Sequence, residues 1–170
     1  MKEKISVNGL KLSAALVSIW VRSRNTPSAA MSLLCRMLSA MQVNIAFLTS
    51  SEDDATAMCC IDAEDQATVE ALLNHDSELK AVVQFGQRVG LLSLYPHKAS
   101  LKLLGAVLQA LTENGLAVHG VASSIAALTF VVDYDCLDDA VAILNGCMIL
   151  PSNPAAFRAD FKVRQEALLK

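Results

Sequence analysis

The sequence predicts an α+β protein built from two copies of one β-α-β-β-α-β unit, laid end to end along 170 residues. The first observation is order, because segments with strand and helix periodicity follow one another in the same sequence twice. The second is a detail of the opening strand: the segments at 16–20 and 90–95 both place a serine among apolar residues and close on an aromatic. Many α/β chains share the coarse pattern, but order and serine recurring together over about 75 residues favour a duplication.

The first copy is expected at 15–88. A β-branched, apolar stretch predicts its first strand, and Pro27 after a polar turn is typical of the first position of a helix. The elements expected in order are a strand at 15–22, a helix at 28–42, strands at 43–49 and 56–61, a helix at 62–74 and a strand at 81–85. Asp62 is expected to cap the second helix.

The second copy is expected at 89–150, with a strand at 90–95, a helix at 99–113, strands at 116–122 and 125–132, and a helix at 137–144. Asn114-Gly115 is a helix stop, and Asp135 with Asp138 predicts a capped start for the last helix. The N-terminal segment at 1–14 is expected to add a strand at 4–7 before a turn at Asn8-Gly9, and the tail at 151–170 is expected to be helical.

Composition limits the classes of function. Apolar residues make up 54% of the chain and mean hydropathy is +0.42, yet no apolar run reaches the roughly 20 residues of a membrane span. A net charge of −3 without a dense basic cluster argues against nucleic acid and anionic membranes as partners. Five cysteines, an odd number without a CxxC pair, indicate reduced core thiols in a cytoplasm.

The excess of apolar residues also predicts a homo-oligomer, most simply a dimer. Each sheet is expected to carry helices on one face only, and Val17, Ile19, Met58 and Ile61 are candidates for the uncovered face. A second copy of the chain would cover them.

No pattern predicts catalysis, a metal site or a cofactor. The three histidines have no ligand spacing, and the repeated serines lie outside any nucleophile elbow. The Cys59-Cys60 pair is expected within a strand, with its side chains on opposite faces, and the carboxylates gather in turns and at helix starts. An enzyme on this scaffold would need a converging set of such groups.

Several short motifs resemble the ACT domain, and most closely the regulatory ACT repeats of aspartate kinases. In the second copy these are Gly90 to Ser93, the helix end at 111–118, the segment at 123–133 and the segment at 139–144. In the first copy they are Asn25-Thr26-Pro27 before the helix and Val43-Asn44-Ile45 after it. The resemblance covers about 15–150 and implies a ferredoxin-like fold, with two four-stranded antiparallel sheets or one merged eight-stranded sheet and four helices on one face.

The resemblance also implies a non-catalytic, allosteric regulator. ACT domains are similar in binding small ligands, usually amino acids, between the first strand-to-helix turn of one copy and the second strand of a paired copy. Carried onto this sequence, the implied ligand residues are Arg24, Asn25, Thr26, Pro27, Ser28, Asn44 and Ile45 in the first copy, and His97, Lys98, Ala99, Ser100, Val118 and His119 in the second. A helix N-terminus suits a carboxylate in such a turn.

The turn before the first helix departs from the family pattern in both copies, and this favours an alternative. The usual glycine of the turn is missing, since Ser28-Ala29 and Ala99-Ser100 stand there, and a side chain hinders close approach of a ligand to the backbone. The alternative is a structural or protein-interaction module that keeps the fold without a ligand. No kinase catalytic half is present in the sequence, so a regulated enzyme would be a separate chain.

Overall fold

The computed structural model describes residues 4–23, 27–51, 54–95 and 100–149. These residues form two compact units. The first unit is Ala15–Arg88, and the second unit combines residues 4–14 with residues 89–149. The tail expected to be helical, at 151–170, lies outside the described residues.

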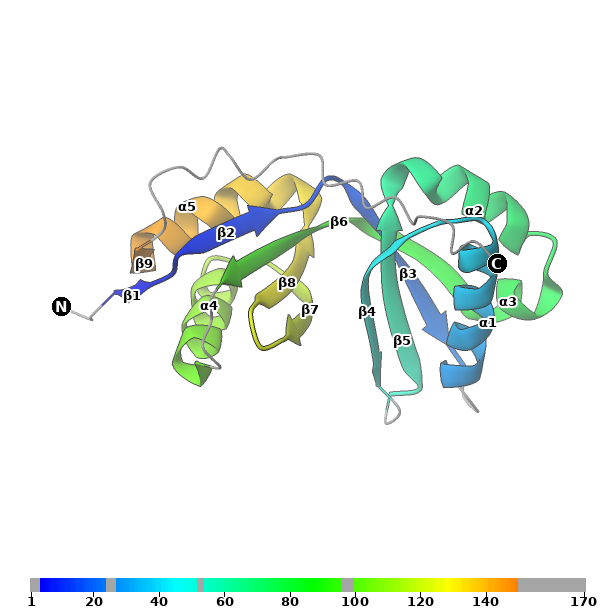
Figure 1. Ribbon diagram of the computed structural model, residues 1–170, viewed down its shortest axis with the longest axis horizontal. Helices are drawn as coiled ribbons and strands as arrows, with labels where there is room; N and C mark the ends of the chain where they lie inside the picture. Colours follow the sequence, from blue (N-terminus) through cyan, green and yellow to red (C-terminus); the bar gives the residue numbers. More distant parts are fainter. Residues whose placement is uncertain (1–3, 24–26, 52–53, 96–99, 150–170) are drawn as a thin grey trace, which may run out of the picture. The chain divides into compact units, whose positions relative to one another are not determined.

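The first unit has the expected β-α-β-β-α-β order with one additional helix before its last strand (Figure 1). Its elements are β3 (Leu16–Arg22), α1 (Pro27–Ala40), β4 (Ile45–Ser51), β5 (Thr56–Asp62), α2 (Gln66–Leu73), α3 (Ser77–Val82) and the first part of β6 (Val83–Tyr95). The strand order is β4-β5-β3-β6, and β3 and β4 both pair antiparallel with β5. This arrangement confirms the α+β, ferredoxin-like fold for the first copy.

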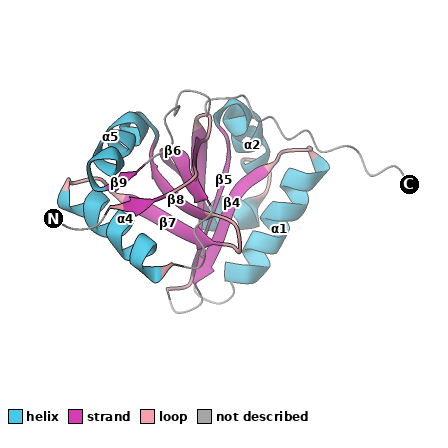
Figure 2. Ribbon diagram, turned by 60° about the vertical axis from the view of Figure 1, so that its left-hand side comes forward, coloured by secondary structure: helices cyan, strands magenta, loops and turns pink. Residues whose placement is uncertain are grey.

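The core of the first unit lies between one sheet face and its helices. Alternate residues of β3 and β5 point to this face and meet an apolar stripe of α1. The central members are Val17, Ile19, Val21, Met31, Leu34, Leu38, Cys59, Ile61, Val69, Leu73 and Leu79. Figure 2 shows α1 and α2 on the same side of β4 and β5.

The prediction that Val17, Ile19, Met58 and Ile61 lie on an uncovered apolar face is therefore wrong. Val17, Ile19 and Ile61 point to the helix-covered face, because period-two alternation places odd-numbered residues of β3 and β5 there. Met58 is on the other face and is fully buried as well. None of the four is free to be covered by a second copy.

Helix α3 was not predicted, and it is the third α-helix among the described residues of the first unit. Asp76 begins it, since its Oδ1 accepts hydrogen bonds from the backbone N–H groups of Glu78 and Leu79, both at 3.0 Å. The strand expected at 81–85 begins only at Val83 and is continuous with the strand expected at 90–95. Sequence patterns separated them because Gly86 and polar neighbours interrupt the apolar run.

The second unit repeats the same order with one strand supplied from the N-terminus. Strand β6 continues into α4 (Leu101–Glu113), β7 (Val118–Ser123), β8 (Leu128–Asp133) and α5 (Leu137–Cys147). The strand order is β7-β8-β6-β2, where β2 is Gly9–Leu12 and runs antiparallel to β6. Figure 2 shows α4 and α5 on the same side of β7 and β8.

Strand β2 corrects the expectation for the N-terminal segment. A turn was expected at Asn8-Gly9, but Gly9 pairs with Tyr95, and a Cβ at this position would collide with the tyrosine ring. Leu10 and Leu12 enter the core of the second unit. The expected short strand at 4–7 is β1 (Ile5–Ser6), which pairs parallel with β9 (Met148–Ile149).

The helix ends of the second unit agree with the sequence in one case and differ in another. Gly115 has a φ of +76° after α4, as the predicted Asn114-Gly115 stop requires. Asp135 does not cap α5, because a 3-10 turn at Tyr134–Cys136 precedes the helix and leaves Cys136 at the cap position. Among the described helices, none is long and apolar enough to cross a membrane.

Candidate functional site

The described ligand candidates of the first unit, Pro27, Ser28, Asn44 and Ile45, lie at two ends of its sheet. Pro27 and Ser28 open α1, whose first turn carries no acidic residue. Arg22, at the end of β3, pairs with Thr56, which pairs in turn with Ser51 at the end of β4. Asn44 and Ile45 stand at the start of β4, and Ile45 pairs with Ile61 at the opposite end of β5. Figure 1 shows the same separation, with α1 starting near the arrowhead of β3.

The second unit has the same geometry. Ser100 caps α4, where its Oγ accepts a hydrogen bond of 3.1 Å from the backbone N–H of Leu103. Val118 pairs with Val132 at one end of β8, whereas the other end of β7, Ser123, pairs with Leu128. The predicted ligand residues that lie within the described ranges therefore do not converge within one unit. Arg24, Asn25, Thr26, His97, Lys98 and Ala99 lie outside the described residues.

A β-bulge occurs at the same place in both units. The pairing of β4 with β5 shifts between Ile45 and Phe47, which leaves Ala46 as the extra residue. The pairing of β7 with β8 shifts between Val118 and Gly120, which leaves His119 as the extra residue. A bulge re-aims a side chain and commonly lies near functional sites.

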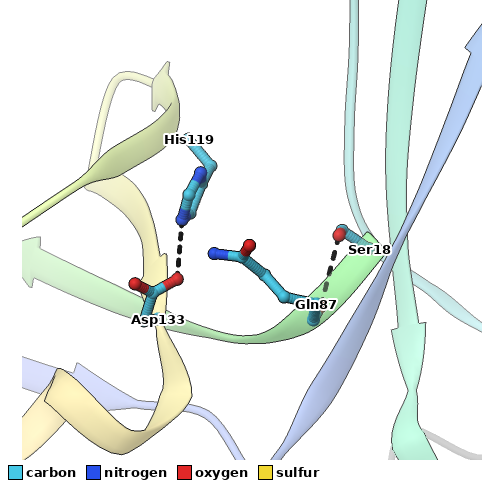
Figure 3. A network of polar contacts seen from close by, with 4 residues as sticks. All are labelled: Ser18, Gln87, His119 and Asp133. Atoms are coloured by element: carbon cyan, nitrogen blue, oxygen red, sulfur yellow. Dashed lines mark hydrogen bonds and ion pairs between the residues drawn. The ribbon is translucent and has the colours of Figure 1, made fainter. Parts of the chain in front are cut away.

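The bulge of the second unit aims His119 at an acid. Its Nε2 lies 2.7 Å from Oδ1 of Asp133, the last residue of β8 (Figure 3). Both side chains keep partial exposure, 23% for His119 and 37% for Asp133. The contact joins two adjacent strand ends at the sheet edge, and it holds the imidazole in a defined orientation.

The sequence patterns placed Asp133 among the carboxylates of turns and helix starts and at the end of the ACT-like segment at 123–133, but not among the predicted ligand residues. The available signal was the repeat itself, because Asp62 and Asp133 both end the third strand of their copies. The two carboxylates make different hydrogen bonds. Asp62 Oδ1 accepts a 3.0 Å hydrogen bond from the N–H of Glu64, whereas Asp133 makes no side-chain cap bond.

The repeated serine and the paired cysteines of the first unit have structural roles. Ser18 is buried and donates a 3.2 Å hydrogen bond from its Oγ to the backbone oxygen of Gln87, both within the first unit (Figure 3). Burial raises the pKa of Cys59 and of Cys60 to about 12, so neither thiol ionises at neutral pH. Within the described ranges, no group of three His, Cys, Asp or Glu residues could hold a metal ion.

Two surface hollows lie elsewhere. In the first unit, one is lined by Glu70, Leu73, Asn74, Lys80, Val83, Gln84 and Phe85. In the second unit, one is lined by Lys4, Ile5, Lys102, Ala106, Gln109, Ala110, Glu113, Gly146 and Cys147. Among the predicted ligand residues that the structure describes, none lines either hollow.

Solved structures share the fold of this chain. The ligand-free regulatory subunit of aspartate kinase from Thermus thermophilus aligns with a TM-score of 0.72 and 10% identity, over 85% of this chain and 99% of that chain. A structure of aspartokinase alpha and beta subunits aligns with a TM-score of 0.73 and 11% identity, over 83% and 97%.

Full-length enzymes match over a smaller share of their length. Aspartokinase III from E. coli, in complex with lysine and aspartate, aligns with a TM-score of 0.63 and 16% identity, over 86% of this chain and 34% of that chain. No protein-family model matches the sequence, and no curated protein matches it significantly. The predicted resemblance to aspartate kinase ACT repeats is thus confirmed at the level of the fold.

Proposed function

We propose that this chain is a non-catalytic regulatory protein that binds a small ligand, an amino acid, at the interface of paired ACT-like repeats. The observation that carries the proposal is the extent of the likeness, because 97% and 99% of two chains described as regulatory subunits of aspartate kinase align with 83% and 85% of this one. The proposed repeats are 15–88 and 89–150, with β2 completing the second.

The geometry of each unit supports a site made by two copies. The helix start and the second-strand start stand at opposite ends of a unit, so a ligand that touches both needs a partner repeat. Strands β4 and β7 each form one edge of their unit's sheet, and neither carries a charged residue or proline. Each edge carries one bulge, but it lacks the charges and prolines that most often protect an edge from pairing with another strand, which supports a homo-oligomer, most simply a dimer.

The partner of the regulator would be a separate enzyme. An amino acid bound across two repeats changes how the copies pack, and the enzyme senses that packing through differential affinity for the two states. The buried, un-ionised thiols of β5 suit a reducing cytoplasm.

A thermal-shift panel of the twenty amino acids at millimolar concentration tests the proposal. A ligand at 100-fold excess over its Kd stabilises the protein by about 2.7 kcal/mol, and titration calorimetry then gives the Kd and stoichiometry. Sedimentation with and without the ligand reports the oligomer. If none of the twenty stabilises the chain, the binding function is wrong, and the missing turn glycines at Ser28-Ala29 and Ala99-Ser100 would favour the interaction module.

A further inference from the structure

The two units carry different side chains, Ala46 and His119, at equivalent positions of their sheets. Each has a bulge on its second strand beside the last residue of its third strand, and that last residue is an aspartate in both. The first unit sets the exposed methyl group of Ala46 at the bulge and uses Asp62 to cap a turn. The second unit sets the His119 imidazole at the bulge, 2.7 Å from Asp133.

We propose that the two units contribute differently to ligand binding: His119 of the second unit contacts the polar part of the ligand, and Asp133 is the positioning residue of that imidazole. The inference rests on the proposed ligand-binding function. It goes beyond it by assigning polar recognition to one of two pseudo-equivalent positions and by naming a residue that acts only through another.

Asp133 fixes both the direction and the protonation pattern of the ring. A carboxylate accepts hydrogen bonds, so the Nε2 atom that faces it carries the proton, and the hydrogen bond of one ring nitrogen sets the role of the other. The bulge adds the second constraint, since it orients the His119 side chain from the backbone side. An imidazole that is constrained by the Asp133 carboxylate and by the backbone of the bulge is pre-organised, which lowers the entropic cost of ordering it around a ligand.

The first unit has the bulge and the aspartate but no imidazole between them. A methyl group at Ala46 offers no hydrogen bond, and the Oδ1 of Asp62 is already engaged by the N–H of Glu64. Its bulge therefore provides shape and apolar contact only. An amino acid, with an ammonium and a carboxylate, matches the position that carries His119 and not the one that carries Ala46.

Four variants of the full chain test this difference between the units: His119→Ala, His119→Gln, Asp133→Asn and, as the matched control, Asp62→Asn. Titration calorimetry uses whichever amino acid the panel identifies. We expect affinity to fall on the order of tenfold or more for His119→Ala, which removes the imidazole. We expect a fall of similar size for Asp133→Asn, because a neutral amide holds the ring less strongly than a carboxylate and its NH2 group can donate to Nε2, which favours the other tautomer. Asp62→Asn should bind as the natural chain does, because asparagine also caps a turn.

His119→Gln separates recognition from stability. Glutamine still donates to Asp133, so the thermal midpoint should return toward that of the natural chain while affinity stays low. Equal binding by the natural chain and His119→Ala would overturn the difference between the units while leaving the proposed function intact. If no amino acid binds the natural chain, the proposed function fails first and the difference between the units falls with it.

The positioning role has a readout without any ligand. The ¹⁵N chemical shifts of the imidazole nitrogens report the tautomer, and the His119→Ala spectrum identifies which signals belong to this ring. We expect Asp133→Asn to change the tautomer distribution of His119 and Asp62→Asn to leave it unchanged. An unaltered His119 signal in Asp133→Asn would overturn the role of Asp133, whatever the calorimetry shows.

Discussion

Ser93 and Thr129 share a hydrogen bond of 2.8 Å between their hydroxyl oxygens, across the neighbouring strands β6 and β8. Ser93 is the repeat counterpart of Ser18, and both central serines bond to an adjacent strand instead of serving as nucleophiles. We predict that Ser93→Ala and Thr129→Val each lower the free energy of unfolding by about 1 kcal/mol. The double variant should cost less than the sum of the two, and urea denaturation measures all three. Strict additivity would contradict a direct bond.

A pair of glycine substitutions should act in opposite directions. A Cβ at Gly86 would overlap Ser18 Oγ and lie 3.0 Å from the Trp20 indole nitrogen, so Gly86→Ala should destabilise the fold by about 1–3 kcal/mol. Gly105 lies inside α4 with nothing within 4 Å of its Cβ position, so Gly105→Ala should stabilise by about 0.5–1 kcal/mol. Thermal midpoints check both, and equal signs would refute the packing argument.

The helix missed by the sequence depends on one cap. Asp76→Ala removes the acceptor for two backbone N–H groups at the start of α3, and we expect a loss of about 1 kcal/mol in unfolding free energy. Asp135 is exposed and caps no helix, so Asp135→Ala should change stability by less than about 0.5 kcal/mol. A larger effect for Asp135→Ala than for Asp76→Ala would contradict these cap assignments.

Thiol chemistry should follow burial. Burial raises the pKa of Cys59 and Cys60 from an ordinary value of 9.0 to about 12. The stability that these neutral thiols contribute is complete below about pH 9 and is lost as pH rises toward 12, because the unfolded chain releases the protons first. Alkylation at pH 8 followed by mass spectrometry should modify exposed Cys147 first and this buried pair last. Early modification of the pair would refute their placement.

Much of the fold follows from local signals that tertiary contacts did not override. The period-two runs of β3 and β5, the apolar stripe of α1 and the Asn114-Gly115 stop all predicted their elements correctly. The position of the bulges was not predictable, because a bulge depends on the register between two strands and not on either strand alone.

The candidate site was likewise predictable only in part. The sequence by itself predicted the duplication and the order of most elements, since these depend on spacing along the chain, and the resemblance to the ACT family made His119 a candidate. Only the tertiary structure decided that β2 completes the second sheet, that Val17 and Ile19 face helices, and that His119 meets Asp133. The physical reason is that strand pairing brings together residues far apart in sequence, and period-two alternation does not say which face a helix will cover.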